Sequence, residues 1–298
     1  MRSFPPKEER HQLFGSVPPS LGTKPWQKED MTDIQKTEQD FYFHLEQVGI
    51  CHMFYPIHIV SKTAPQRQTT TAEFSLSTSL PAHQKGIHMS RLTEQLHSFY
   101  ESNKPFDVNT LKELTAALAR KMDQSSASVQ VAFPWYMEKQ SPVTGQSGLM
   151  HATVKYDVHF HEKDGWTCHV GCDAQVTTLC PCSKEISEYG AHNQRGSVSI
   201  LVELFEQASL PDDIKAVLLH IIESNASAPL YPVLKRPDEK KVTEEAYENP
   251  RFVEDITRLI AIELYEQPWI KGFQVECRNE ESIHQHDAYA KCFYQKNL

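Results

Sequence analysis

The sequence contains no apolar run approaching the roughly 18 residues that a membrane-spanning helix needs. Its first residues, MRSFPPKEERHQ, lack the apolar stretch of a secretory signal peptide. Asp and Glu number 39 against 30 Lys and Arg, so a net charge of −9 offers nucleic acid no basic face. These absences predict a cytoplasmic protein without membrane or nucleic-acid partners. An anionic substrate would need cations concentrated at one site.

A disulfide framework is also missing, because seven cysteines in 298 residues are an odd number without the density of a cystine-stapled fold. In a reducing compartment most such thiols are small buried hydrophobic residues. The composition, 39% hydrophobic and 23% charged, is that of a globular protein. The length fits two modules of about 130 residues each better than one compact core.

The first half begins with residues 1–34, rich in Pro, Lys, Glu and Gln, which are predicted to be a mobile or loosely docked leader. Strands are then predicted from β-branched and aromatic residues, and helices from apolar residues at helical spacing. One helix has Leu111, Leu114, Leu118 and Met122 on one face, with Asn109 or Thr110 as N-cap. The predicted order is strands 41–62 and 67–80, helices 89–101 and 109–122, and strands 126–138 and 148–165.

The second half repeats this order of elements. Its last helix is predicted to have Asn249 as N-cap and Pro250 at its first position. We therefore predict an α+β fold of two tandem modules, each an antiparallel sheet with two helices, over 35–164 and 165–298. The predicted elements are strands 166–180 and 196–206, helices 211–225 and 249–266, and strands 270–280 and 288–295.

The stretch TTLCPCSKEISEYGAHNQRG, residues 177–196, concentrates groups with chemical potential. Cys180 and Cys182 flank Pro181, and on an extended backbone their side chains would point the same way. A closed structural zinc site needs four ligands, and no second cysteine pair follows. One thiolate, one imidazole from His192 and one carboxylate would instead leave a metal position open for catalysis. The simpler alternative makes both cysteines core residues and His192 a loop residue.

Three other segments carry polar groups that have structural explanations as well. The charged run LKRPDEKKVTEEAYENP, residues 234–250, is most simply a solvated loop. Glu254 stands in the first turns of a helix, where a carboxylate suits the helix dipole. Glu281, His284 and His286 lie together in NEESIHQHDA, a polar turn if not a site. A further pair, His159 and His161, shares one strand face and faces either a metal or solvent.

These segments, together with KGIHMSRL at 85–92, resemble the GTP cyclohydrolases of type IB, over about residues 35–298. The resemblance implies a tunnelling fold and a homotetramer with active sites between subunits. It also implies metal-dependent hydrolysis of GTP to 7,8-dihydroneopterin triphosphate and formate, the first step of folate biosynthesis. The other type of GTP cyclohydrolase carries a Cys-x-x-His motif, which is absent near Cys180.

The resemblance also implies residue roles. One divalent metal, Mn, Fe or Zn, is held by Cys180, His192 and Glu239, with Cys180 also counted as catalytic. Glu254 is the guanine anchor, and Glu281 with His284 is the proton-transfer pair. The implied triphosphate ligands are Lys184, Arg195, His88, Ser90 and Arg91, the last three reaching in from a neighbouring subunit.

Two other functions fit parts of the sequence. A related tunnelling-fold nitrile reductase would use the cysteine as a nucleophile on a deazaguanine, with a nicotinamide cofactor, and would need no metal. A non-catalytic metal-binding scaffold would have a closed four-ligand site and leave GTP intact. Metal analysis separates the first from a cyclohydrolase, and incubation with GTP separates the second.

Overall fold

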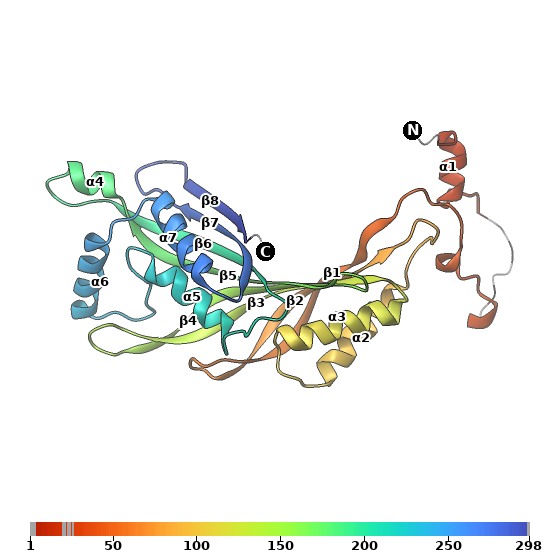
Figure 1. The fold of residues 1–298 in the computed structure, drawn as a ribbon, viewed down its shortest axis with the longest axis horizontal. Helices are drawn as coiled ribbons and strands as arrows, with labels where there is room; N and C mark the ends of the chain where they lie inside the picture. Colours follow the sequence, from red (N-terminus) through yellow and green to blue (C-terminus); the bar gives the residue numbers. More distant parts are fainter. Residues whose placement is uncertain (1–3, 20–21, 23–24, 26, 297–298) are drawn as a thin grey trace.

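The computed structural model describes residues 4–19, 22, 25 and 27–296, and its centre is one antiparallel sheet of eight strands (Figure 1). The strands lie in the sheet in their chain order, so each pairs with the next. They are β1 Leu45–Val60, β2 Arg67–Leu80, β3 Ser126–Gln140, β4 Ser147–His161, β5 Gly165–Leu179, β6 Asn193–Leu204, β7 Ile270–Asn279 and β8 Ala288–Gln295.

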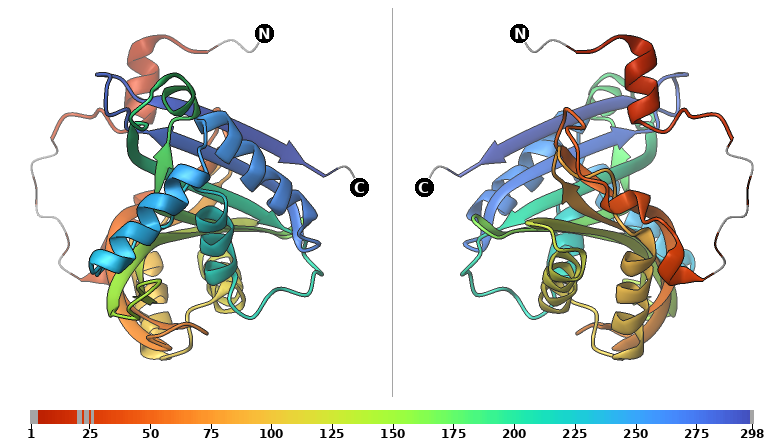
Figure 2. Two further views of the ribbon diagram at one scale, coloured as in Figure 1. Left: turned by 90° about the vertical axis from the view of Figure 1, so that its left-hand side faces the viewer. Right: turned by 90° about the vertical axis from the view of Figure 1, so that its right-hand side faces the viewer.

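Two helices follow β2, a short helix follows β5, and three helices follow β6. Helices α2, α3, α5 and α7 lie on one face of the sheet, and the other face carries none of them (Figure 2). None of the described helices is long and apolar enough to cross a membrane. The helices are α1 Lys7–Leu13, α2 Met89–Glu101, α3 Val108–Met122, α4 Pro181–Ile186, α5 Ile214–Ser224, α6 Arg236–Glu248 and α7 Val253–Glu266, with 3-10 turns Lys28–Asp30 and Ile34–Lys36.

The predicted α+β class is confirmed, including the order strand, strand, helix pair, strand, strand in the first half. The sheet does not break between the halves, because β4 and β5 pair from His161 opposite Gly165 to Thr153 opposite Asp173. The predicted module boundary at 164/165 therefore falls in a tight turn within one sheet. The two-module division remains a prediction about how the chain is organised.

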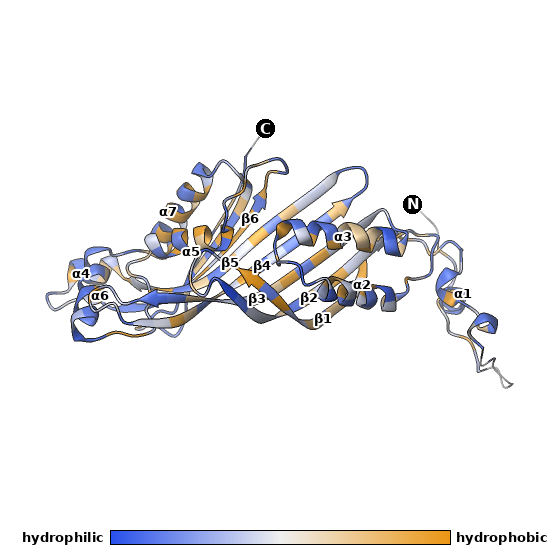
Figure 3. Cartoon of the chain, turned by 90° about the horizontal axis from the view of Figure 1, so that it is seen from below, coloured by the Kyte–Doolittle hydropathy of each residue, from blue (hydrophilic) through white to orange (hydrophobic). Residues whose placement is uncertain are grey.

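Alternation along each strand decides which face meets the helices. In β6, Val198, Ile200 and Val202 are buried beneath the helices, while Ser197 and Ser199 face the other way. The coloured bands across the sheet in Figure 3 follow this alternation. The four apolar residues predicted on one face of the helix at 109–122 are all buried, which confirms that face. The core thus fixes one face of the sheet for packing and leaves a polar face open.

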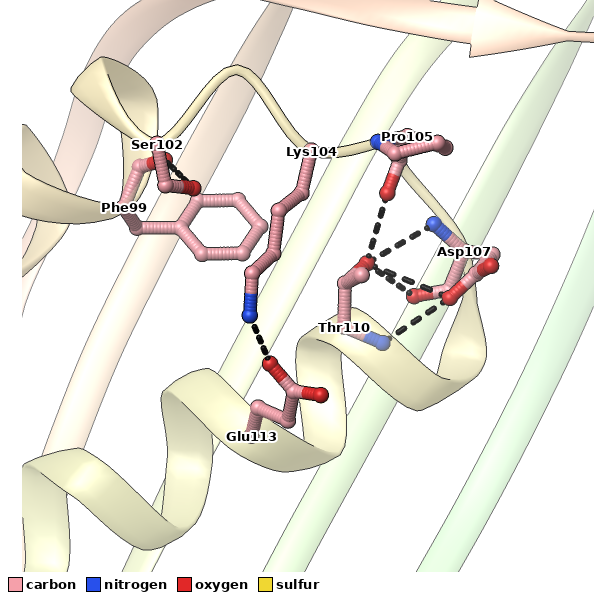
Figure 4. A network of polar contacts seen from close by, with 7 residues as sticks. All are labelled: Phe99, Ser102, Lys104, Pro105, Asp107, Thr110 and Glu113. Carbon is pink, nitrogen blue, oxygen red and sulfur yellow. Dashed lines mark hydrogen bonds and ion pairs between the residues drawn. The ribbon is translucent and has the colours of Figure 1, made fainter.

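The start of α3 differs from the prediction by two residues. Asp107, not Asn109 or Thr110, is the N-cap, and its Oδ1 accepts from Thr110 N at 2.8 Å (Figure 4). Thr110 Oγ1 accepts in return from Asp107 N at 3.1 Å, which completes a capping box. The ion pair between Lys104 and Glu113 lies beside this cap. Thr110 is therefore part of the cap, but from inside the helix.

The charged run at 234–250 is not a loop, and this prediction was wrong. It forms α6, which displaces the start of the next helix: Asn249 is the C-cap of α6, and α7 begins at Val253 after Phe252. Pro250 therefore lies in the connection. The anchor of α6 is Asp238, which accepts from Val143 N, Thr144 N and Lys235 N at 2.8–2.9 Å and from Thr144 Oγ1 at 2.6 Å. These bonds hold the pKa of Asp238 well below its usual range despite its burial.

Most of the leader is described, apart from residues 1–3, 20–21, 23–24 and 26. Helix α1 has no buried residue, and it meets the body through Phe14 against Phe41 and through Lys85 Nζ donating to Leu13 O at 3.2 Å. Further attachment comes from Gln35, whose Nε2 donates to Ile87 O at 2.7 Å, and from Thr37, whose carbonyl accepts from Lys85 N at 3.2 Å. Backbone bonds from Gln39 and Phe41 to residues 83 and 82 continue it.

A buried aspartate with an ion-pair partner joins the two halves of the chain. Asp213, the N-cap of α5, contacts Lys215 Nζ at 2.9 Å, and their side chains are 5% and 8% exposed. Ser61 Oγ and Lys62 N, from the β1–β2 turn, donate to the same carboxylate at 2.5 and 2.9 Å. Burial alone would raise the pKa of Asp213, but these bonds and the Lys215 charge outweigh it and lower the pKa. The carboxylate therefore stabilises the fold in its charged form.

We expect Asp213→Ala to destabilise the protein by about 3–5 kcal/mol, because it leaves the Lys215 ammonium buried without a counter-charge. The double variant Asp213→Leu/Lys215→Met should recover much of that loss. In the wild type, the stabilisation is present above the unfolded pKa of about 3.9 and is lost as pH falls below it. Urea unfolding at pH 7 measures the first effect, and urea unfolding at a series of pH values from about 4 downward measures the second. A single variant as stable as the wild type at pH 7 would contradict this account of the ion pair.

Candidate functional site

The site begins where β5 and β6 stop pairing. Leu179 is opposite Asn193 in the last ladder pair, and one step further Cys180 N donates to His192 O at 3.1 Å. Cys180 and His192 are therefore cross-strand neighbours, whose Cβ atoms are expected about 5 Å apart. Neither side chain is fully exposed, and His192 is 14% exposed. The sequence separates these two residues by a loop, and the ladder brings them together.

The third strand of the ladder adds a carboxylate. Gly196 is opposite Asn279 on β7, and Glu280 N donates to Arg195 O at 2.9 Å, so Glu281 follows beside the same end. Glu281 Oε2 lies 3.9 Å from His192 Nδ1, and its side chain is 15% exposed. A thiol, an imidazole and a carboxylate thus gather at one corner of the sheet, as the resemblance implied for Cys180, His192 and Glu281.

The glycine that ends the stretch 177–196 serves this corner. Gly196 lies between β5 and β7 on the helix-covered face. A Cβ there would come within 3.1 Å of Thr178 Cγ2 and 3.2 Å of Asn279 Oδ1. The close approach of the three strands at this point is therefore easiest with glycine.

The sequence suggested an extended backbone through the Cys-Pro-Cys segment, but the segment is the end of a strand followed by a helix. Strand β5 ends at Leu179, Cys180 is the N-cap of α4, and Pro181 occupies its first turn. Cys182 is therefore on the helix and exposed, so the two thiols do not share a strand face. Ser183 fastens the turn, because its Oγ donates to Cys180 O and accepts from His192 N, both at 3.1 Å. This local network holds the two residues of the pair in place.

Helix α7 brings a second acidic group to this end of the sheet. Arg251 N donates to Leu179 O at 3.0 Å, which places the start of α7 next to the last residue of β5. Glu254 lies in the first turn of α7 and is exposed. Lys184 of α4 extends to the C-terminal end of α6, where Nζ donates to Tyr247 O at 2.5 Å and lies 4.2 Å from the Tyr247 ring centroid. Both residues therefore border the Cys180–His192 corner.

Glu239 does not join this corner within one chain. It is exposed in the first turn of α6, next to Asp238, which is bound to the β3–β4 loop. Tyr247, the point where α6 meets α4, lies eight residues further on, about 12 Å along the helix axis. Among the described residues, no group of three His, Cys, Asp or Glu side chains is arranged to hold a metal ion. This includes His159 and His161, which contact Ser128 and Asp164 instead.

Arg195 lies on the opposite face of the sheet from the Cys180–His192 pair, because it is one residue out of phase with Gln194 and Gly196. Its guanidinium donates to Gln175 Oε1 at 3.2 Å. Both residues line a cavity of about 680 Å³ in the fork where β4 and β5 separate beyond Thr153 and Asp173. Figure 1 shows α6 spanning the outer end of this fork, between the β3–β4 loop and α4.

The α2 residues lie far from the Cys180–His192 corner in one chain. His88 is the N-cap of α2, followed by Ser90 and Arg91, and Figure 1 shows α2 and α4 in opposite halves of the molecule. His88 Nε2 is 3.2 Å from Asp33 Oδ2, an ion-pair distance without a well-directed hydrogen bond. His88 and Arg91 line a cavity of about 310 Å³ together with Gln35 and Lys36, which directly follow the leader. The leader thus borders a predicted substrate-binding segment.

His284 is exposed in the β7–β8 loop and stacks on His286, with ring centroids 4.9 Å apart. Its backbone N donates to Glu281 O at 3.4 Å, so the loop ties it to the corner without burying it. The ring therefore lies at the surface near Glu281.

The donor chemistry at the corner fits a divalent metal at two of its ligand positions. His192 Nδ1 is 2.9 Å from Gln194 Oε1, an amide oxygen that can accept a hydrogen bond but cannot donate one. A hydrogen bond in this contact requires the proton on Nδ1 and leaves Nε2 with the lone pair that a metal requires. Sequence reasoning missed Gln194 because a glutamine carries no ligand signal; only its position two residues from His192 on one strand face could have indicated it.

Comparison with known proteins gives a consistent result. A family model described as type I GTP cyclohydrolase folE2 matches residues 31–290. A protein of Bacillus licheniformis named GTP cyclohydrolase FolE2 is 56% identical over 293 residues, covering 98% of each chain. A protein of Bacillus subtilis with the same name is 53% identical over 295 residues, covering 99% of this chain and 97% of that one. The urate oxidase of Bacillus sp. TB-90 superposes with a TM-score of 0.47 at 8% identity, over 85% of this chain and 100% of that one.

The seven cysteines, all unpaired, should separate by reactivity. Burial raises the pKa of Cys168 and Cys277 to about 11, and it raises the pKa of Cys172 as well. At pH 8 we expect iodoacetamide to alkylate these three at least about 10²-fold more slowly in the native protein than in urea, since the thiolate reacts. Mass spectrometry of a time course measures this, with exposed Cys182 as the internal control. Labelling of the three as fast as Cys182 would contradict their burial.

Proposed function

Because the chain belongs to the type I GTP cyclohydrolases of the folE2 family, we propose that it hydrolyses GTP at C8 of guanine. The products are formate and 7,8-dihydroneopterin triphosphate, the first intermediate of folate biosynthesis. The observation that carries this proposal is the meeting of Cys180, His192 and Glu281 at the end of the β5–β6–β7 ladder.

In this proposal Cys180 and His192 hold one divalent ion, manganese, iron or zinc, with the thiolate and Nε2 as ligands. Such an ion lowers the pKa of bound water toward neutrality and so supplies a nucleophile for C8. Glu239 is assigned as the third ligand. It is remote from the pair in one chain, so this assignment requires either a copy from a neighbouring subunit or a different position of α6.

The remaining roles follow from charge and position. Glu254, exposed beside the corner, accepts hydrogen bonds from the N1–H and amino group of guanine, which adenine cannot provide. Glu281 and His284 exchange protons with the opening and closing rings, a task suited to an imidazole near neutral pH. Lys184, Arg195, His88, Ser90 and Arg91 are assigned to the triphosphate.

We assign the active unit as a homotetramer with active sites between subunits, in the cytoplasm. Support comes from the separation of α2 and α4 in one chain, because His88, Ser90 and Arg91 can reach a Cys180–His192 corner only in another subunit. Further support comes from the two edges of the sheet, where β1 and β8 each have one partner strand. Exposed Phe54 on β1 and Phe293 on β8 lie along these edges.

The direct test of the proposed activity is incubation of the purified protein with GTP, with and without manganese. We expect equimolar amounts of formate and of a pterin that becomes fluorescent after oxidation. ATP should give neither product. A protein that leaves GTP unchanged under all metal conditions would refute the activity.

Chelation should abolish turnover, and added manganese or ferrous iron should restore it. Cys180→Ala should lose both the bound metal and turnover, because a methyl group cannot replace a thiolate ligand. Cys182→Ala is the matched control and should keep both, since that thiol is exposed on α4. Metal analysis and GTP turnover on the three proteins give the answer. Undiminished turnover in metal-free enzyme would overturn the metal assignment.

Glu254→Gln tests base recognition separately from the chemistry. The swap replaces an acceptor by a donor opposite guanine, and a lost charge-assisted bond costs about 1.5–3 kcal/mol, plus the unpaired group. We expect kcat/KM to fall by about 10² or more, with metal content unchanged. Glu266→Gln, exposed at the other end of α7, is the control and should keep wild-type kinetics. Wild-type kinetics in Glu254→Gln would end the base-anchor assignment, and loss of metal would move Glu254 into the ligand set.

A further inference from the structure

The side chain of Gln194 makes the only side-chain hydrogen bond of the His192 ring among the described residues. His192 immediately precedes β6 and Gln194 is the second residue of that strand, so their side chains point to the same face of the sheet. His192 Nδ1 to Gln194 Oε1 is 2.9 Å, whereas Glu281 Oε2 is 3.9 Å from the same nitrogen and too far for a hydrogen bond. The ring is therefore oriented by an uncharged amide and not by the neighbouring carboxylate.

Gln194 itself is held rigidly. Its backbone pairs with Thr178 in the β5–β6 ladder, and Thr178 is fully buried. The Gln194 side chain lies on the helix-covered face and the residue is 8% exposed. The same ladder carries Cys180 two residues beyond Thr178 and His192 two residues before Gln194. Two successive cross-strand pairs on one face thus contain the thiol, the imidazole and the amide that orients it.

We infer that Gln194 is a positioning residue: it fixes the proton of His192 on Nδ1 and presents Nε2, with its lone pair, toward Cys180. An amide carbonyl can only accept a hydrogen bond, so in the neutral ring it leaves Nε2 as the unprotonated nitrogen. A carboxylate at position 194 would orient the ring in the same way, whereas an apolar side chain would leave the ring free to change tautomer and rotate. The expected effect on metal affinity rests on the proposed metal-dependent function, whereas the orientation of the His192 ring does not.

The primary measurement is the tautomer of His192 in metal-free protein, read from imidazole nitrogen chemical shifts of histidine-labelled samples and assigned with His192→Asn. The wild type should show the Nδ1-protonated form. Gln194→Glu should keep it, because it keeps the acceptor. Gln194→Met, which has the same chain length without an acceptor, should show a mixture of tautomers. A wild-type ring protonated on Nε2, or a Gln194→Met ring unchanged from wild type, would overturn the inference.

The second measurement is manganese affinity, by competition with a chelator. Gln194→Met should bind manganese about 10- to 100-fold more weakly than the wild type, the usual effect of removing the partner of a metal-ligating histidine. Gln194→Glu should rescue most of this loss. Gln130→Met, at an exposed position of β3, is the control and should bind as the wild type does.

The outcomes distinguish a failure of the positioning role from a failure of the proposed function. A Gln194→Met variant with wild-type affinity overturns the positioning role. A wild-type protein that binds no divalent metal overturns the proposed function, while the tautomer still decides whether Gln194 orients the ring. If Gln194→Met does not fold, the wild-type and Gln194→Glu spectra remain decisive, since an Nε2-protonated ring in either one contradicts the inference.

Discussion

The register of the β5–β6–β7 ladder is the constraint on which the rest of the site depends. Strand pairing has a side-chain period of two, so a slip of one residue would move Cys180, His192 and Gln194 to the open face. Buried residues prevent such a slip: Val176, Val198 and Cys277 all face the helices in the observed register. The apolar core therefore does more than stabilise the sheet, because it sets which polar residues meet at its end.

Ends of elements, rather than their middles, supply the chemical groups. Cys180 begins α4, His192 precedes β6, Glu281 follows β7 and Glu254 opens α7. Residues at such positions are free of ladder bonding on one side and can face a substrate while the sheet holds them rigidly. Helix α6 connects this corner to the β3–β4 loop, with Asp238 at one end and the Lys184–Tyr247 contact at the other. A substitution at either end of α6 is therefore expected to change the position of the element that the other end contacts.

Much of the fold could be predicted from local patterns, since buried faces repeat at the period of each element. The face of α3 and the order of strands followed from such periodicity. Helix α6 did not, because its stability comes from the buried bonds of Asp238 to a loop almost a hundred residues away, which no local pattern records. The N-cap at Asn249 failed for the same reason, since the residues before it were already helical.

The candidate site divides in the same way. The family resemblance pointed to Cys180, His192 and Glu281, and the strand ladder brings them together. Gln194 could not be predicted, because its contact with His192 depends on the strand register. Glu239 and the α2 residues were predicted by resemblance alone, and within one chain they lie apart from the Cys180–His192 corner.

The central claim is that Cys180 and His192 together bind a divalent metal, and X-ray absorption of the zinc-loaded protein tests it most directly. The account predicts one sulfur scatterer at about 2.3 Å and imidazole nitrogen at about 2.0 Å per zinc, with the sulfur lost in Cys180→Ser. A zinc shell of nitrogen and oxygen only in the wild-type protein, at full occupancy, would contradict it.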